Sequence, residues 1–239
     1  TYSACNQSAS VYAKQVTLGR NGFAADLVTP IGEAKLEAKL LGHFNFSNVL
    51  AVVTALIGYL GIDSRASLQA LCDQMARLKP VSGRMEIVGN SDITTVVDYA
   101  HTPDALANAL AALRPHVSGR LICVFGCGGD RDRGKRPDMA REAEAVADWV
   151  IVTDDNPRTE APAAIVADIL EGFRHPDRVA VIHDRAEAIR RAIASAVPGD
   201  LVLVAGKGHE DYQEIQGQKL PFSDAEHVRH CLNLNGGVA

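Results

Sequence analysis

The chain has 239 residues, of which 47% are hydrophobic and 22% charged, so it can bury the core of one large or two modest domains. Its net charge of -5 argues against a general binder of nucleic acid or of anionic membranes. No apolar run approaches a membrane span, since the longest, 49–60, is interrupted by polar and small residues.

The first 42 residues alternate as strands do, and turn signals at 19–22 and 29–33 predict an antiparallel meander. We expect its strands over 11–18, 23–28 and 34–41. A helix over 47–60, apolar on nearly all sides, is expected to be buried. A second helix over 64–78 begins with Ser64 as its cap and ends at a Lys-Pro pair.

Beyond a linker expected at 80–83, apolar strands alternate with helical segments. This alternation predicts an α/β fold, with a mostly parallel sheet flanked by helices on both faces. We expect strands over 94–98, 120–125, 149–153, 179–182 and 201–205. We expect helices over 103–113, 137–147, 161–172, 185–196 and 225–233.

The start of the chain and its cysteines bear on its origin. Thr1 stands where an initiator Met would be expected, and no signal-peptide pattern follows it. We therefore expect the C-terminal part of a longer protein, although proteolytic processing would give the same start. The five cysteines are scattered, form no pair with zinc-ligand spacing and indicate a reducing cytoplasm.

Polar clusters follow several of the predicted strands directly. Ligands of an open parallel sheet bind in the crevice beyond the carboxyl ends of its strands, so we expect these clusters to form a single site. They lie at 98–101, 126–135, 154–160 and 206–210.

The cluster 154–160 carries the most varied chemistry. Arg158 can pair with a carboxylate through two parallel hydrogen bonds. Asn156 can donate and accept, and Asp155 or Glu160 can hold an ammonium. Together these groups suit the zwitterionic head of an amino acid. The alternative is a polar turn that caps the next helix.

The segment 126–137 is rich in glycine and basic residues and opens a predicted helix. Glycines let the backbone approach an anion, and a helix N-terminus favours negative charge. A phosphate or carboxylate site is therefore predicted rather than a solvated basic turn. The spacing fits neither a dinucleotide fingerprint nor a Walker A loop. The basic residues are Arg131, Arg133, Lys135 and Arg136.

The clusters at 98–101 and 206–210 leave a ligand role and a structural role open. Asp98 can bind ribose hydroxyls, with Tyr99 and His101 beside a base or phosphate, but His101 can equally be a cap or a surface residue. Glu210 can receive an ammonium, or its segment is a flexible solvent loop.

Two further residues are candidates for a nucleotide. Asn48 lies near the start of the predicted helix 47–60, where its amide can read a nucleobase edge, whereas Asn45 or Ser47 can simply cap that helix. Arg84 follows the expected linker and can reach a nucleotide lying between domains, or form a surface ion pair of little energetic value.

Taken in this order, the clusters 42–48, 83–86, 98–101, 126–137, 155–158 and 206–210 resemble the Mur ligase family. The resemblance spans essentially the whole chain and rests on the set rather than on one motif. It implies a three-domain enzyme with a UDP-sugar domain, a central ATPase domain and a C-terminal Rossmann-like domain that binds the amino acid. Residues 1–82 would then be the end of the central ATP-binding domain, and 83–239 the C-terminal domain.

Within this family, Asp-Asn-Pro-Arg accompanies meso-diaminopimelate, and lysine-adding relatives typically differ there. The resemblance implies a ligase that uses ATP and Mg²⁺ to add meso-diaminopimelate to UDP-N-acetylmuramoyl-L-alanyl-D-glutamate, through an acyl phosphate. The residues it implies for diaminopimelate are Arg131, Asp155, Asn156, Pro157, Arg158, Gly206 and Glu210. Those it implies for ATP are Asn48, Arg84, Asp98, Tyr99 and His101.

The sequence lacks several features of the family pattern. The Walker lysine loop, the modified lysine, the Mg²⁺-binding residues and the UDP-sugar domain have no counterpart in the 239 residues. We therefore expect ATP and Mg²⁺ to be bound mainly outside this chain, which would hold no catalytic or metal-binding residue and would not ligate alone. The alternatives are a lysine- or glutamate-adding relative, a nucleotide-dependent oxidoreductase suggested by the glycine-rich strand exits, and a non-catalytic binding module.

Overall fold

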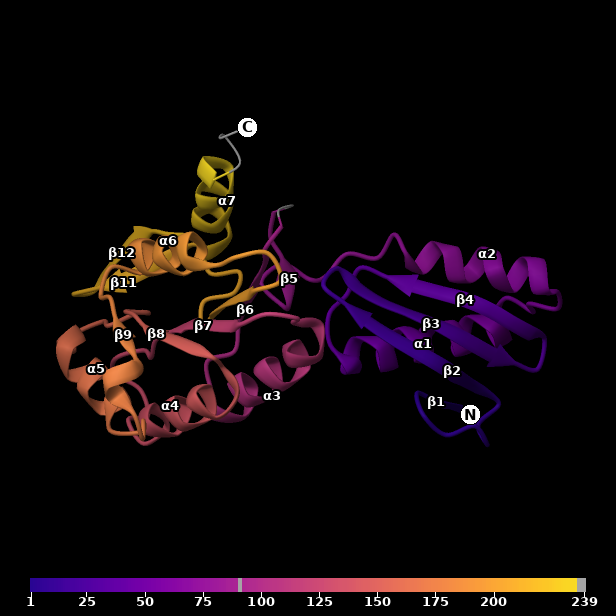
Figure 1. The fold of residues 1–239 in the computed structure, drawn as a ribbon, viewed down its shortest axis with the longest axis horizontal. Helices are drawn as coiled ribbons and strands as arrows, with labels where there is room; N and C mark the ends of the chain where they lie inside the picture. The colour runs from indigo at the N-terminus through magenta and orange to yellow at the C-terminus, as the bar shows by residue number, and fades with distance from the viewer. Residues whose placement is uncertain (90–91, 236–239) are drawn as a thin grey trace. The chain divides into compact units, whose positions relative to one another are not determined.

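The computed structural model describes residues 1–89 and 92–235, which divide into two compact units, Thr1–Pro80 and Val81–Ala239 (Figure 1). In these ranges, no helix combines the length and the apolar character that a membrane crossing requires. Each unit has a hydrophobic core of its own.

The first unit is an antiparallel sheet with helices on one face. Its strand order is β1-β2-β3-β4, and only the β1–β2 pair is parallel. This confirms the predicted meander, because alternate residues such as Phe23, Ala25 and Leu27 are buried against the helices. The elements are β1 (Tyr2–Ser3), β2 (Val11–Gly19), β3 (Gly22–Thr29), β4 (Gly32–Ala38), α1 (His43–Tyr59) and α2 (Arg65–Met75).

The helices of this unit differ from their predictions in detail. The prediction of a Ser64 cap on α2 is confirmed, because the Ser64 side chain accepts from the backbone of Ser67. Helix α1 begins four residues earlier than predicted, after Gly42, which has φ 88°. The prediction that α1 is buried holds for one side only: Phe46, Val49, Leu50 and Val53 are buried, whereas Val52 is 48% exposed and Tyr59 86%.

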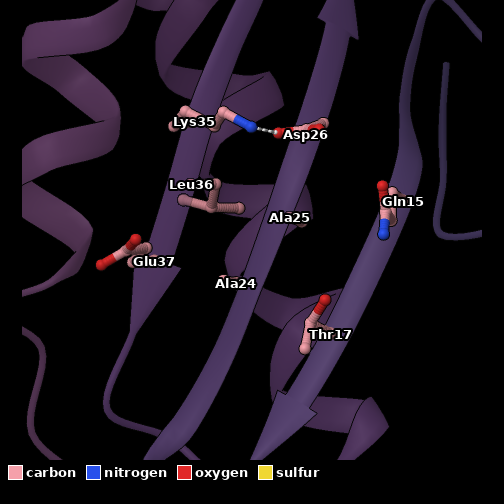
Figure 2. A pocket seen from close by; sticks show the side chains of 8 residues that line it. All are labelled: Gln15, Thr17, Ala24, Ala25, Asp26, Lys35, Leu36 and Glu37. Carbon is pink, nitrogen blue, oxygen red and sulfur yellow. Dashed lines mark ion pairs between the residues drawn. The ribbon is translucent and has the colours of Figure 1, made fainter.

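The other face of this sheet is solvated and hollowed. Lys35 and Asp26 form an ion pair across β3 and β4 there (Figure 2). The side chains that line the hollow are Gln15, Thr17, Ala24, Ala25, Asp26, Lys35, Leu36 and Glu37. No residue predicted to bind a ligand lies among them.

The second unit confirms the predicted α/β fold. Its main sheet has the order β5-β6-β10-β7-β8-β9, parallel except for β5. The central strands β6, β7 and β10 are buried at every residue; β7 and β10 are apolar throughout, and β6 adds Thr94, Thr95 and Asp98 to two valines. The strands are β5 (Glu86–Ile87), β6 (Thr94–Asp98), β7 (Leu121–Phe125), β8 (Trp149–Val152), β9 (Ala180–Val181) and β10 (Leu201–Ala205).

Helices cover both faces of this sheet, as predicted (Figure 1). Helices α3, α4 and α5 pack side by side on one face, and α6 and α7 on the other. The bounds are α3 (Pro103–Leu113), α4 (Lys135–Val146), α5 (Pro162–Leu170), α6 (Arg185–Ser195) and α7 (Asp224–Asn235), with short 3-10 turns at Arg114–His116 and Pro176–Arg178.

The structure adds elements that the sequence did not predict. The edge strand β5 is one, and a hairpin of β11 (Tyr212–Ile215) and β12 (Gln218–Pro221) is another. The turn of the hairpin has positive φ at both Gln216 (51°) and Gly217 (74°), the backbone that tight hairpins favour. Helix α4 also begins two residues before its predicted start.

Candidate functional site

The predicted polar clusters lie at one edge of the second unit's sheet. They follow β6, β10, β7 and β8, which are neighbouring parallel strands whose carboxyl ends share that edge. Because β10 lies between β6 and β7, the segment that begins at Gly206 sits between the segments that follow those strands. The fold thus brings four distant stretches of sequence together at the edge where an open parallel sheet forms its ligand crevice.

A buried lysine stands at the centre of the crevice. Lys207 is fully buried, and its Nζ donates to Asn156 Oδ1 at 2.9 Å and to Glu210 Oε2 at 3.2 Å. Asn156 Nδ2 donates to the same Glu210 oxygen at 3.0 Å. Asp155 Oδ1 lies 3.8 Å from the ammonium. Three residues predicted to bind the amino acid are therefore held together by Lys207, which the sequence reasoning did not single out.

Asp155 and Gly206 are in direct contact. A Cβ added to Gly206, whose φ is +121°, would lie 2.6 Å from Asp155 Oδ2, so a larger residue would displace the carboxylate. Burial raises the pKa of Asp155, and the positive charges of Arg185 and Lys207 partly offset that effect. Arg185 is itself held by Asp224 at 2.7 Å and donates to the carbonyl of Ala205.

Arg158 extends from the loop after β8, with φ 51°. Its Nη1 donates to the carbonyl of Gly129 at 2.7 Å, and its Nε lies 3.3 Å from Glu214 Oε2. The hairpin residue Gln213 donates to the carbonyl of Asp155 at 2.8 Å. The hairpin, which the sequence did not predict, thus borders the Asp155–Arg158 loop. Arg131 is exposed, and its side chain donates only to the carbonyl of Asp130 among the described residues.

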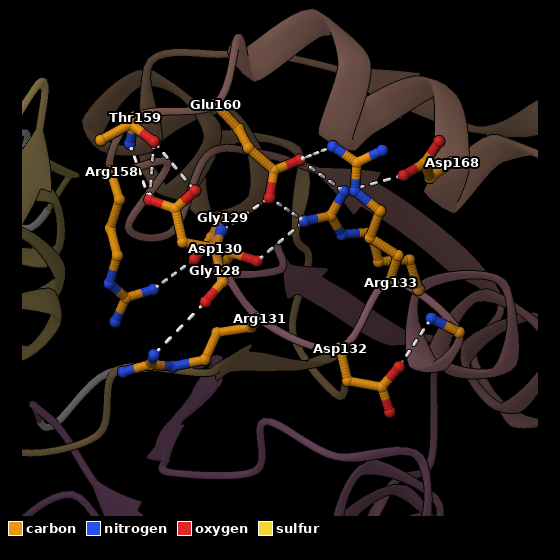
Figure 3. A network of polar contacts seen from close by, with 12 residues as sticks. Gly128, Gly129, Asp130, Arg131, Asp132, Arg133, Arg158, Thr159, Glu160 and Asp168 are labelled. Carbon is orange, nitrogen blue, oxygen red and sulfur yellow. Dashed lines mark hydrogen bonds and ion pairs between the residues drawn. The ribbon is translucent and has the colours of Figure 1, made fainter.

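The basic segment is organised by Glu160 (Figure 3). The Glu160 carboxylate accepts from Arg136 at 2.8 Å and from Arg133 at 2.9 Å. Hydrogen bonds from Arg136 and from the Asp130 amide lower the pKa of Glu160 to about 2. Arg136 is fully buried and also pairs with Asp168 at 2.7 Å.

These contacts correct two expectations. Glu160 was expected as an ammonium ligand, but its carboxylate is occupied by arginines of its own chain. In the segment 126–137, where an anion site is predicted, Arg133 and Arg136 both bind Glu160 and so already have a counter-charge within the chain. Lys135 likewise donates to the carbonyl of His101 at 2.7 Å. The sequence alone did not show which cation pairs with which carboxylate, because Arg136 and Glu160 are 24 residues apart in the chain.

The nucleotide candidates of the second unit form a platform around Tyr99. The Arg84 guanidinium lies 4.6 Å from the Tyr99 ring centroid, and the His101 and His209 rings are at 4.6 and 5.4 Å. Arg84 lies over the Tyr99 ring, whereas His101 meets that ring edge-on at 62° and His209 is tilted at 36°; such a group of aromatic rings with a cation suits a planar base. Asp98 is the last residue of β6, and its carboxylate accepts from the amides of Met85 and Ala100.

Asn48 lies in the first unit, exposed on α1. The alternative cap residues Asn45 and Ser47 do not cap α1, because the helix begins after Gly42. Asn45 Nδ2 instead donates to the carbonyl of Leu41 at 2.7 Å.

Two residues of the site, Lys207 and Glu214, were not predicted from the sequence. Lys207 stands between two glycines directly after a buried strand, and that placement could have marked it. Glu214 could not have been found, because it belongs to the unpredicted hairpin. In the ranges that the structure describes, no three His, Cys, Asp or Glu side chains are grouped so as to hold a metal ion.

An open α/β sheet with charged loops beyond its strand ends is an architecture in which small-molecule sites commonly lie. Residues 83–208 match the family described as Mur ligase, glutamate ligase domain. The chain belongs to the Mur ligase family. The oxidoreductase alternative is thereby set aside.

Several relatives carry the same name, UDP-N-acetylmuramoyl-L-alanyl-D-glutamate–2,6-diaminopimelate ligase. The protein of that name from Pseudomonas aeruginosa is 54% identical over 233 residues, which cover 97% of this chain and 47% of the relative. That from Synechocystis is 48% identical over 98% of this chain and 46% of the relative. A solved structure of a ligase of that name has a TM-score of 0.84 and 44% identity, covering all of this chain and 48% of that one. The chain thus spans about half the length of the curated relatives it matches.

Proposed function

We propose that this chain supplies the amino-acid pocket and part of the ATP site of a ligase that adds meso-diaminopimelate to UDP-N-acetylmuramoyl-L-alanyl-D-glutamate in peptidoglycan synthesis. The names of its relatives support this substrate pair. The observation that carries the proposal is the crevice in which the Asp155–Arg158 loop meets Lys207 and Glu210. Residues 1–82 would be the end of a central ATP-binding domain, and 83–239 the C-terminal domain.

The pocket has the charges that a zwitterion requires. Glu210 and Asp155 are both carboxylates, and Lys207 is the cation that lies between them. Their summed charge is negative, which favours a substrate ammonium beside Asn156. Arg158 provides the opposite charge, and we assign it to the distal carboxylate of diaminopimelate, with the exposed Arg131 nearby in the loop after β7.

Gly206 and Pro157 would shape this pocket. A side chain at Gly206 would meet the Asp155 carboxylate, so the glycine keeps the crevice open. The carbonyl of Pro157 lies against Gly129, where an added Cβ would be 2.0 Å away, so the two loops are in close contact. Both features support a pocket that is formed before substrate arrives.

For ATP, we assign the Tyr99 platform to the base and ribose region. Arg84, Tyr99 and His101 present a cation and aromatic faces, and Asp98 is held at the end of β6. Asn48 remains a proposed ATP contact from the first unit. No role for Mg²⁺ is assigned to any residue of the described ranges, because they contain no suitable ligand cluster.

The reaction transfers the γ-phosphoryl group of ATP to the substrate carboxylate, which gives an acyl phosphate and ADP. The amine of diaminopimelate then attacks the acyl carbon, phosphate leaves, and an amide forms. This chain would contribute by holding the amine in the attacking geometry, and such positioning is a large part of the rate enhancement in bimolecular reactions. We also propose a cytoplasmic location, which the five unpaired cysteines favour.

A substrate panel tests the proposal. The complete ligase that contains this chain is given ATP, Mg²⁺ and UDP-N-acetylmuramoyl-L-alanyl-D-glutamate, with meso-diaminopimelate, L-lysine or D-glutamate as the acceptor. Formation of ADP and of the tripeptide product should be fastest, at equal concentration, with meso-diaminopimelate. A higher kcat/KM with lysine or glutamate would refute the assignment of the substrate.

A further inference from the structure

Arg158, the residue assigned to the substrate carboxylate, already faces a carboxylate of its own chain. Glu214 Oε2 lies 3.3 Å from Arg158 Nε, and the two side chains are 25% and 18% exposed. The contact is ionic and lacks hydrogen-bond alignment, since the described side-chain hydrogen bond of Arg158 runs from Nη1 to Gly129. The guanidinium therefore has donors that a better-placed carboxylate can use.

The backbone of Glu214 is held by hydrogen bonds, whereas the contact described for its carboxylate is the ionic one with Arg158. Its carbonyl accepts from the Arg158 amide at 3.0 Å, and its own amide donates to Asn156 Oδ1 at 2.9 Å. On the far side, the Gln216 amide donates to the Arg158 carbonyl at 2.7 Å. Main-chain hydrogen bonds thus hold the hairpin to the Asp155–Arg158 loop. The Glu214 side chain can therefore turn away from Arg158 without moving β11.

We propose that the Glu214 carboxylate is an internal stand-in for the distal carboxylate of the amino-acid substrate. It neutralises Arg158 in the empty pocket, and the substrate displaces it on binding. This inference rests on the proposed function and adds a specificity-determining residue to it. The stand-in makes the empty pocket stable, because a partly buried guanidinium without a counter-charge is unfavourable.

Displacement has a consequence for selectivity. An acceptor with a distal carboxylate, such as diaminopimelate, must break the Arg158–Glu214 pair before it gains its own contact. An acceptor without that group, such as lysine, leaves the pair intact. Glu214 therefore weakens the binding of diaminopimelate but not that of lysine, and so reduces the difference in affinity between the two. Removing the carboxylate should raise affinity for diaminopimelate, whereas damage to a merely structural residue would lower it.

The test uses the complete ligase in four forms: wild type, Glu214→Gln, Glu214→Ala and the control Glu171→Gln. Glu171 is exposed just beyond α5, so its substitution makes the same change in charge away from the crevice. The KM for meso-diaminopimelate is measured with ATP and the UDP-substrate saturating. We expect KM to fall about fivefold in both Glu214 variants, because the substrate no longer has to break a weak ion pair. The kcat should stay within about twofold of wild type. The control should match wild type, and the KM for lysine should not fall.

The outcomes separate the two proposals. A wild-type enzyme that does not ligate meso-diaminopimelate refutes the proposed function, and the stand-in with it. If the wild-type enzyme ligates meso-diaminopimelate but both Glu214 variants have an unchanged or higher KM for it, only the stand-in proposal is refuted. Two variants are used so that a folding defect in one, detected as a lowered melting temperature, does not decide the result.

Discussion

Replacing Lys207 by Met should strongly destabilise the second unit. Lys207 is fully buried and lies 3.2 Å from Glu210 Oε2 and 3.8 Å from Asp155 Oδ1. The substitution keeps the apolar stem but removes the charge that these carboxylates share. Asp155, which is buried, would then lose one of the two cations, Arg185 and Lys207, whose charges offset its burial.

The size of the effect follows from these distances. Two unit charges 3.2 Å apart attract by about 5 kcal/mol at an effective dielectric constant near 20, before the loss of hydration is subtracted. Removing one partner of a buried pair typically costs about 3–5 kcal/mol. Glu210 is 22% exposed and can turn toward water, so we expect the lower end, about 3 kcal/mol.

The single tryptophan makes the measurement specific. Trp149 lies in β8 of the second unit, so its fluorescence during urea unfolding reports on that unit alone. The unfolding midpoint should fall by about 1–2 M urea. Lys219→Met, at an exposed site whose ammonium lies 4.1 Å from the Tyr212 ring, is the control and should cost below about 1 kcal/mol. A loss below about 1 kcal/mol for Lys207→Met would refute the reasoning.

Three further substitutions test other parts of the site. Arg158→Ala in the complete ligase should raise the KM for meso-diaminopimelate about tenfold or more, because a charged hydrogen-bonding partner is lost; an unchanged KM would contradict its assignment. Gly206→Ala should lower stability by about 1–3 kcal/mol and raise the same KM, since φ is +121° and the new Cβ would meet Asp155, whereas Gly58→Ala, with nothing within 4 Å, should do neither. The pKa of Glu160 is lowered to about 2, so its stabilisation is complete above its unfolded value of about 4.5 and is lost as pH falls toward 2. In the Glu160→Gln variant, the free energy of unfolding, followed by Trp149 fluorescence, should therefore fall less than in wild type as the pH is lowered from about 4.5 to about 2. The same fall as in wild type would count against the Arg136–Glu160 interaction.

The main elements of the fold could be predicted because their patterns are local. Strands β7, β8 and β10 consist largely of apolar residues, and the Ser64 cap on α2 uses local side-chain chemistry. The start of α1 was misplaced because Gly42, rather than a polar side chain, begins the helix. The hairpin was missed because β12 is exposed at every residue, which leaves no alternation to detect.

The composition of the candidate site was predictable only in part. The loops could be placed at one edge, because parallel strands end together. Which side chains pair with one another at that edge of the sheet depends on tertiary contacts between residues far apart in sequence. Arg136 reaches Glu160 and Asp168 across two loops, and Lys207 reaches Asn156 from 51 residues away. No local pattern encodes such partners, so the sequence could not show that Glu160, considered beside Asp155 for an ammonium, pairs with Arg133 and Arg136 instead.

The insertion of β10 between β6 and β7 has a consequence for how the second unit is made. Strand β10, residues Leu201–Ala205, is synthesised after every other strand of the main sheet, yet it fills the centre. Until it emerges from the ribosome, β6 and β7 present unpaired apolar edges, which are prone to aggregation. The crevice cannot exist in a partly synthesised chain, because Gly206, Lys207 and Glu210 arrive with the same strand. A nonsense mutation that removes only the last sixth of the chain would therefore remove the sheet's centre and the pocket together.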